Sequence, residues 1–551
     1  MRAAITVLAA ALLPVFLVAC ASTTESERAS SRLPVTQACD DADAPCPSAL
    51  PHRKSDGAAS TTEGRVTVGG KAIRYRAVAG RITVHKRDWQ DTQPSAGKGA
   101  KSVQPEAAMF YVAYFKEDER ADQRPITFVF NGGPGSSSIW LHMGAFGPRR
   151  VATSDPALVG QSHLVSNEYS LLDASDLVFV DAPGTGFGNV RGKDAQKAFY
   201  GTDADVEAFA EFITKFLSKN NRWNSPKYLL GEGYGALRAA ALINVLETRD
   251  DTSFNGIIFL SQILNFELPG SSGALGSLNP GLDLPYELAL PSFTATAWYH
   301  HKLPGGRQPL EPLLAKARRF ALTSYAQALR QGALLSQADR AAIIEQLHQY
   351  TGLPDSYIDK ANLRIDSGEF EHELLGGSDA TVGQIDSRVT GPSLDPLSQR
   401  AGYDPQSAAV RSEYLSAFNQ YARETLHCGY GMTYKADIPV LHLWNFWHAS
   451  PSQASPVQQW PNAMPDVVNA MKYDPHLKIM MNEGYFDLET PFTEGWYEMH
   501  HLQIPETLKG NVRYNYYNYG HMLNVSSPVL KALHDRISAF IAATDSISNP
   551  G

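Results

Sequence analysis

The sequence predicts an α/β fold in which a mainly parallel central sheet is covered by helices on both faces. The first observation is a series of short, continuous apolar runs, which are typical of strands buried on both sides. The second is that helical patterns, such as those at 203–217 and 234–246, lie between several of these runs. The runs occupy residues 109–115, 126–130, 177–180, 228–230, 257–260, 440–443 and 477–481.

The composition supports a large globular protein and excludes several functions. Hydrophobic residues make up 43% of the 551 residues, which is enough for a buried core and too much for a disordered chain. The formal net charge is −9, which is not the balance of a nucleic-acid-binding protein. The 4 cysteines show no zinc-ligand spacing, so we expect no metal, no cofactor and no disulfide scaffold.

The first 19 residues are interpreted as a targeting signal. Arg2 precedes an apolar run that ends in Leu-Val-Ala-Cys at Cys20, which resembles a bacterial lipobox. We therefore expect removal of residues 1–19 and a lipid anchor on Cys20, although an ordinary secretory signal cut nearby is the alternative. The protein would then be extracytoplasmic and membrane-attached, and Ala21 after Cys20 favours the periplasmic face of a Gram-negative outer membrane.

Residues 20–63 are predicted to be a flexible tether. They are rich in Ser, Thr, Asp and Ala and have no periodicity. They also contain Cys39 and Cys46, whose short spacing is compatible with a local disulfide in an oxidising compartment. Cys428 would then be left over, and pairing with Cys428 is the alternative.

The folded part is expected to have a core in two pieces, 64–269 and 437–545. It opens with alternating apolar residues from Arg65 onwards, which predict antiparallel hairpins. The strand-helix alternation stops at 270–436, where helices are predicted near 310–331 and 336–350. The second of these helices begins with a Ser-x-x-Asp capping signal at Ser336. We interpret 270–436 as an inserted helical cap.

The first motif with chemical meaning follows the apolar run 126–130. Residues 131–138 read Asn-Gly-Gly-Pro-Gly-Ser-Ser-Ser. Glycines allow a sharp turn and leave backbone N–H groups accessible, which is what an oxyanion-binding pocket needs. A plain Gly-Pro turn is the alternative interpretation of this motif alone.

The second motif lies between a predicted strand and a predicted helix. Residues 231–235 read Gly-Glu-Gly-Tyr-Gly, in the strand-turn-helix context of the nucleophile elbow Gly-x-Ser-x-Gly. Gly233 occupies the serine slot of that pattern, and it supplies no oxygen.

The third and fourth motifs each follow a predicted strand near the carboxyl end. They are Gly-Tyr-Phe-Asp, ending at Asp487, and Tyr-Gly-His-Met, containing His521. An acid and then a base after the elbow is the order that hydrolases of this architecture use. Asp487 and His521 are therefore candidates for the acid and base of a catalytic triad.

Together these four motifs resemble the serine carboxypeptidase family of α/β-hydrolases, particularly its bacterial secreted members. The segments 181–188 and 290–299 also agree with the family. The resemblance implies that Asp487 orients His521 as general base, and that the N–H groups of Gly133 and Tyr234 form an oxyanion hole. It further implies that Asn131 and Glu232 hold the C-terminal carboxylate of a peptide substrate.

Two residues depart from the family pattern and leave several functions open. The nucleophilic serine falls on Gly233, through a natural or a deliberate change, and an acid that partners the elbow glutamate in many members falls on Ala145. The favoured hypothesis is a serine carboxypeptidase-like hydrolase that lacks its nucleophile and is nearly inactive. The alternatives are a non-catalytic lipoprotein that binds a peptide or partner, and an esterase or acyltransferase on the same scaffold. The oligomeric state stays open.

Overall fold

The computed structural model describes residues 59–86, 105–152, 163–268, 281–376, 379–449, 451, 459–523 and 526–545. The predicted signal, Cys20, Cys39 and Cys46 lie outside the described residues, as does most of the predicted tether. Cys428 is a free, partly buried thiol. Within the described ranges, no helix has both the length and the apolar character needed to cross a membrane.

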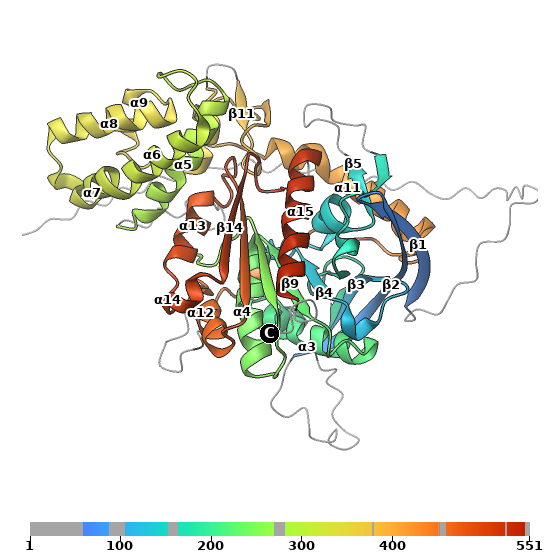
Figure 1. The fold of residues 1–551 in the computed structure, drawn as a ribbon. Helices are drawn as coiled ribbons and strands as arrows, with labels where there is room; N and C mark the ends of the chain where they lie inside the picture. Colours follow the sequence, from blue (N-terminus) through green and yellow to red (C-terminus); the bar gives the residue numbers. More distant parts are fainter. Residues whose placement is uncertain are drawn as a thin grey trace, which may run out of the picture. The chain divides into compact units, whose positions relative to one another are not determined.

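A ten-stranded mixed sheet forms the centre of the fold (Figure 1), in the order β1-β2-β3-β7-β4-β9-β10-β13-β14, with β8 beside β3. Six strands, β7, β4, β9, β10, β13 and β14, pair with one another in parallel. The pairs β1–β2, β2–β3, β3–β7 and β3–β8 are antiparallel. The predicted α/β class is therefore confirmed, with a larger antiparallel part than expected. The strands are β1 (Ser60–Val68), β2 (Lys71–His85), β3 (Glu106–Lys116), β4 (Ile126–Phe130), β7 (Asp176–Val180), β8 (Asn189–Arg191), β9 (Lys227–Glu232), β10 (Gly256–Leu260), β13 (Lys478–Gly484) and β14 (Val512–Tyr517).

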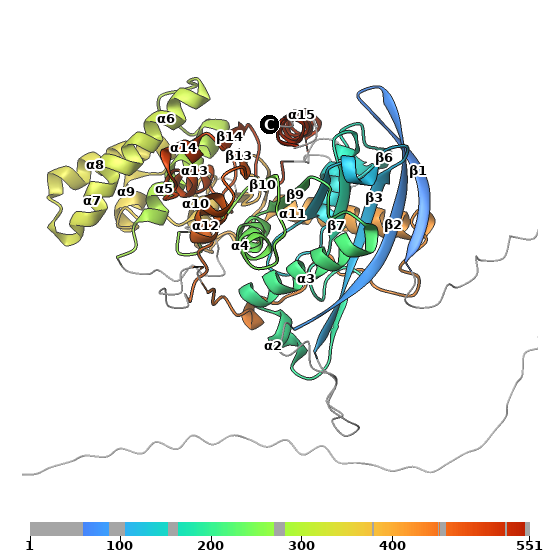
Figure 2. The same cartoon turned by 60° about the horizontal axis from the view of Figure 1, so that its bottom comes forward.

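Helices cover both faces of this sheet because successive strand residues point to opposite sides. In β4, Phe128 and Phe130 belong to the apolar cluster that contains α3 (Thr202–Asn220), α4 (Tyr234–Thr248) and α12 (Met464–Tyr473). Val129 between them belongs to the opposite cluster, which contains α11 (Pro405–Glu424) and α15 (Ser527–Thr544). Figure 2 shows α15 and α4 on the two sides of β9 and β10.

A helical insertion follows β10 and packs around a separate apolar core. Leu290, Phe293, Leu347 and Phe370 are buried in that core. The Ser336 side chain accepts a hydrogen bond from the backbone N–H of Asp339, so the predicted capping signal does begin a helix. The insertion contains α5 (Leu284–Tyr299), α6 (Leu310–Phe320), α7 (Ala326–Gln331), α8 (Gln337–Thr351), α9 (Asp355–Lys360) and α10 (Ser367–Glu373).

Helix α11 lies within the range expected for the cap but packs on the central sheet instead. Its buried residues Val410, Tyr414 and Phe418 are spaced four apart, so they form one face of the helix. That face joins the core cluster that contains Trp140 and β10. The range 270–436 is therefore not a single structural unit, and α11 is placed to contribute to a site in the core.

Two further expectations differ from the structure. The apolar run 440–443 is not a strand but contains a short 3-10 helix, η6 (Leu441–Leu443), in which Leu441 is 46% exposed. Pro439, which has no N–H to donate to a sheet, precedes it. The first strand begins at Ser60, inside the range expected for the tether, because Ser60 to Val68 pair with β2 as an edge strand.

Candidate active site

The turn between β9 and α4 has the geometry of a nucleophile elbow. Gly233 adopts φ +58° and ψ −124°, a conformation that strains any residue with a side chain. The 131–138 loop lies against this turn, since a Cβ on Gly132 would be only 2.5 Å from the backbone nitrogen of Tyr234. The close approach explains why the loop needs glycine at that position, and it places both glycine motifs in one site.

His521 and Asp487 form a buried, hydrogen-bonded acid-base pair. Nδ1 of His521 lies 2.8 Å from Oδ2 of Asp487. The Asp487 carboxylate also accepts the backbone N–H groups of Glu489 at 2.8 Å and Thr490 at 2.9 Å, and the Thr490 hydroxyl at 2.8 Å. The backbone N–H of His521 donates to the carbonyl oxygen of Ile385 at 2.6 Å. These contacts fix the orientation of the imidazole ring.

The other ring nitrogen of His521 faces Gly233. A Cβ placed on Gly233 would lie 3.2 Å from Nε2 and 3.5 Å from Cε1 of His521. Among the described residues, no hydroxyl group is hydrogen bonded to Nε2. Ser261 instead donates its hydroxyl to the backbone carbonyl of His521, and Ser136 donates its hydroxyl to Asp437.

The electrostatics of the pair favour a protonated imidazole. Burial disfavours the charged form of His521, but the carboxylates of Asp487, Glu232 and Glu489 outweigh it and raise the pKa to about 9. Burial also raises the pKa of Glu232 to about 7, although His521 and the Asn131 amide favour the ionised carboxylate.

Asn131 and Glu232 are brought together as the resemblance implied. The side-chain amide of Asn131 donates to Oε2 of Glu232, and its oxygen accepts the backbone N–H of Leu141 at 3.2 Å. Arg238 donates to the backbone carbonyl of Asn131 at 2.6 Å and so supports the loop. Both polar ends of the Asn131 side chain are therefore occupied by protein groups.

The candidate oxyanion donors also lie at this turn. Gly133 lies in the 131–138 loop with φ +107°, and Tyr234 is the first residue of α4. Neither backbone N–H donates to another group within the part of the chain described. Ser136 holds the loop closed by donating its N–H to the carbonyl of Gly132 at 3.1 Å.

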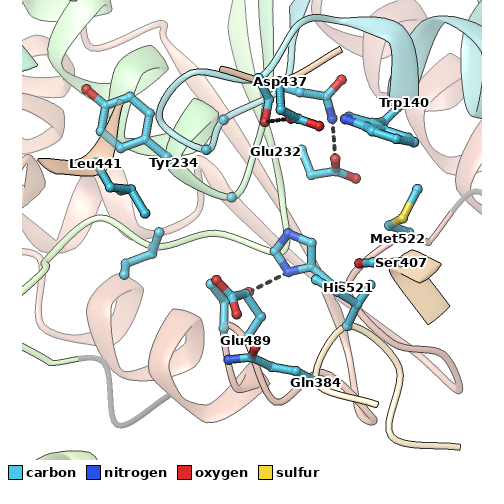
Figure 3. Close-up of a pocket in the computed structure, with 18 of the residues that line it drawn as sticks. Trp140, Glu232, Tyr234, Gln384, Ser407, Asp437, Leu441, Glu489, His521 and Met522 are labelled. Carbon is cyan, nitrogen blue, oxygen red and sulfur yellow. Dashed lines mark hydrogen bonds between the residues drawn. The ribbon is translucent and has the colours of Figure 1, made fainter. Parts of the chain in front are cut away.

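These groups open into a pocket of about 440 Å³ (Figure 3). In the view of Figure 3, Leu441 and Tyr234 lie on one side of the His521 ring, and Trp140 and Met522 lie on the other. Ile263, Phe266 and Phe446 also line the pocket. Within the described ranges, no group of three or more His, Cys, Asp or Glu residues could hold a metal ion.

The sequence motifs missed several residues of this pocket. Thr490 is hydrogen bonded to both Asp487 and His521, and Glu489 lines the pocket next to it. Arg411 reaches the pocket from α11, which no motif marked. Position 145, where the family resemblance led us to expect an acid, holds Ala145. This residue is fully buried in the apolar core and does not line the pocket.

The described structure has the α/β-hydrolase fold, with a glycine turn in the position of the nucleophile elbow. The described structure is similar to the crystal structure of Kex1(delta)p, a prohormone-processing carboxypeptidase from Saccharomyces cerevisiae, with a TM-score of 0.50 and 15% identity. That likeness covers 84% of this chain and 91% of the yeast structure, and it shows the fold.

The sequence comparisons support the serine carboxypeptidase family more specifically. Residues 94–263 match the family model described as Serine carboxypeptidase. A segment of 157 residues is 31% identical to the pheromone-processing carboxypeptidase KEX1 of Phytophthora infestans, covering 28% of this chain and 21% of that protein. Another segment, of 141 residues, is 28% identical to serine carboxypeptidase-like 10 of Arabidopsis thaliana and covers 24% of this chain and 30% of that protein. The alignments thus span less than a third of these relatives' lengths.

Proposed function

We propose that this protein is a serine carboxypeptidase-like hydrolase whose nucleophile position holds Gly233, so that the chain as written binds peptide C-termini without cleaving them efficiently. The observation that carries the proposal is the orientation of the His521 imidazole ring. Its Nδ1 is held by Asp487, and its Nε2 lies 3.2 Å from the point where a side chain at position 233 would begin. His521 is positioned to act as a base in its neutral form, and Gly233 offers no hydroxyl group from which it would take a proton.

The chemistry with a serine at position 233 follows from this arrangement. The hydroxyl oxygen would attack the peptide carbonyl while its proton passes to Nε2, and Asp487 would stabilise the resulting imidazolium. The N–H groups of Gly133 and Tyr234 would stabilise the negative oxygen of the tetrahedral intermediate. The imidazolium would then return the proton to the leaving amine, and water would release the acyl group by the same steps.

The experiment that tests this proposal is labelling with a fluorophosphonate probe, which reacts with activated serines. We expect no adduct on the chain as written and an adduct at position 233 in the Gly233→Ser variant. Gly233→Ala is the matched control, because it adds the same Cβ without the hydroxyl. A strong adduct on another serine of the unmodified chain would refute the assignment of the nucleophile position.

The choice of substrate separates the two enzymatic hypotheses. Position 145 holds Ala145 where many members of the family have an acid, and this single departure is the support for an esterase or acyltransferase. Folded Gly233→Ser protein that hydrolyses blocked esters but not blocked dipeptides would indicate an esterase. If it shows neither turnover nor labelling, the non-catalytic binding protein is the better description.

We also propose that the protein is an extracytoplasmic lipoprotein anchored through Cys20. The support is the sequence of residues 1–20 alone, with its basic start, apolar run and lipobox-like ending. Acyl chains on Cys20 would supply the membrane affinity, because the net charge of −9 gives no attraction to anionic lipid.

A further inference from the structure

We propose that Arg411 is a specificity-determining residue that binds the carboxylate of a peptide substrate. This inference rests on the proposed peptide-binding function and names the residue that supplies the positive charge. Arg411 lines the same pocket as Gly233 and His521, but it comes from α11, far from the motifs in sequence.

The position of Arg411 is fixed by two neighbours. Its Nη2 lies 2.7 Å from Oδ2 of Asp437, and its guanidinium carbon lies 5.6 Å from the centre of the Trp140 ring. Asp437 also accepts the hydroxyl of Ser136, so the ion pair connects α11 to the 131–138 loop. Asp437 and Trp140 thereby hold the guanidinium at the pocket wall next to the candidate site.

The guanidinium has unused hydrogen-bonding capacity. An arginine side chain carries five N–H donors in a planar fork, and a carboxylate can accept two of them in parallel. The ion pair with Asp437 involves Nη2 of Arg411. The Arg411 side chain is 54% exposed, so solvent and a ligand can reach the remaining donors.

The pocket is lined by several acidic side chains, so an anionic ligand needs a positively charged partner such as Arg411. Glu232, Asp437 and Glu489 all line the pocket, and in their ionised forms they oppose the entry of another carboxylate. Among the described lining residues the basic groups are Arg411 and His521, and His521 is already paired with Asp487. The Asn131 amide donates one of its two N–H groups to Glu232, and it carries no positive charge with which to offset these carboxylates. Arg411 is therefore the available partner for a carboxylate.

We assign the bound group to the α-carboxylate of the C-terminal residue. The side-chain carboxylate of an acidic residue has the same chemistry, and three ligands distinguish the two sources. They are N-acetyl-Phe-Leu as the free acid, the same dipeptide as its C-terminal amide, and N-acetyl-Phe-Glu as its α-amide. Calorimetric titration of the unmodified chain measures the affinity for each ligand without hydrolysis, because position 233 supplies no nucleophile.

The expected result is that the free acid binds about 10- to 100-fold more tightly than its amide, as a charged hydrogen-bonded contact would give. Arg411→Met should remove that difference, and Arg411→Lys should retain part of it. Arg340→Met is the matched control, because Arg340 also contacts an aspartate at 2.7 Å but does not line the pocket. Thermal melting of each variant shows that it is folded.

Several outcomes would overturn the inference. If Arg411→Met keeps the preference for the free acid, another group binds the carboxylate. If the unmodified chain binds acid and amide equally, the inference fails while peptide binding stands. If it binds none of the three ligands, the proposed function fails as well. A preference for the glutamate amide that Arg411→Met abolishes would keep Arg411 as the carboxylate ligand and refute the α-carboxylate assignment.

Discussion

Replacing Gly233 by serine should turn this protein into an active hydrolase at a small cost in stability. The substitution adds a Cβ 3.2 Å from Nε2 of His521, which is slightly closer than an ordinary contact, so the imidazole must move by a few tenths of an ångström. The added hydroxyl then lies within reach of that nitrogen. No other part of the candidate triad has to be built, because the Asp487 contact is already present at 2.8 Å.

The cost and the gain can be estimated separately. A residue with a side chain at φ +58° costs about 1–3 kcal/mol of backbone strain. Removing a triad nucleophile lowers turnover by about 10^6, while oxyanion binding and positioning leave roughly 10^3 to 10^4 over the uncatalysed reaction. Restoring it should therefore raise turnover by several orders of magnitude while lowering the free energy of unfolding only slightly.

The assay compares the unmodified chain, Gly233→Ser and Gly233→Ala on a blocked dipeptide and a blocked ester. Both variants should lose similar stability in denaturant unfolding, because they share the strained φ and the added Cβ. Turnover and probe labelling should increase in Gly233→Ser alone. Equal activity in Gly233→Ala, or an inactive but folded Gly233→Ser, would refute the reasoning.

Three further predictions address the triad, the pH dependence and the anchor. In the Gly233→Ser background, Asp487→Asn should lower kcat by about 10^4, because the amide favours the wrong tautomer of the imidazole and cannot stabilise the imidazolium, whereas circular dichroism should show an unchanged fold. Burial and Asp474 raise the pKa of Glu247 in the folded protein to about 8, so its contribution to stability is present at acid pH and is lost as the pH rises from about 4.5 to 8. Glu247→Gln should therefore have little effect on Tm at pH 4.5 and raise it at pH 8.5; an equal shift at both would contradict the shifted pKa. In a bacterial host with lipoprotein processing, Cys20→Ala should abolish palmitate incorporation and release the protein from membranes, and unchanged sedimentation with membranes would refute the anchor.

The parts of the fold that were predictable are those with strong local patterns. The runs at 126–130 and 257–260 become β4 and β10, because continuous apolar segments of this length fit a sheet covered on both faces. The run at 440–443 is also mostly apolar but forms η6, since Pro439 and the lack of a pairing partner decide its structure. The composition of a run does not tell whether a strand of the sheet has a free edge with which the run could pair.

The candidate site was predictable where glycine motifs follow strands, and unpredictable where helices supply side chains. Gly233 lies more than 250 residues before Asp487 and His521, and their strand-end positions alone suggested that the three meet. Arg411 gave no such signal, because an arginine on an amphipathic helix usually faces solvent. Its placement depends on α11 packing on Trp140 and the central sheet rather than within the cap.

The state of the buried charged groups bears on how the site came to hold glycine. Glu232, Asp487 and His521 are 6%, 0% and 9% exposed, and the desolvation of such groups destabilises the folded state unless their interactions offset it. A chain with no use for them would gain stability by replacing them with apolar residues of similar size. If Gly233 replaces a serine, as we propose, their presence favours a recent or deliberate change at Gly233, or a continuing role in binding. The ligand titrations and the Gly233→Ser assay distinguish these two cases, because only a recent change predicts both full binding and immediate recovery of turnover.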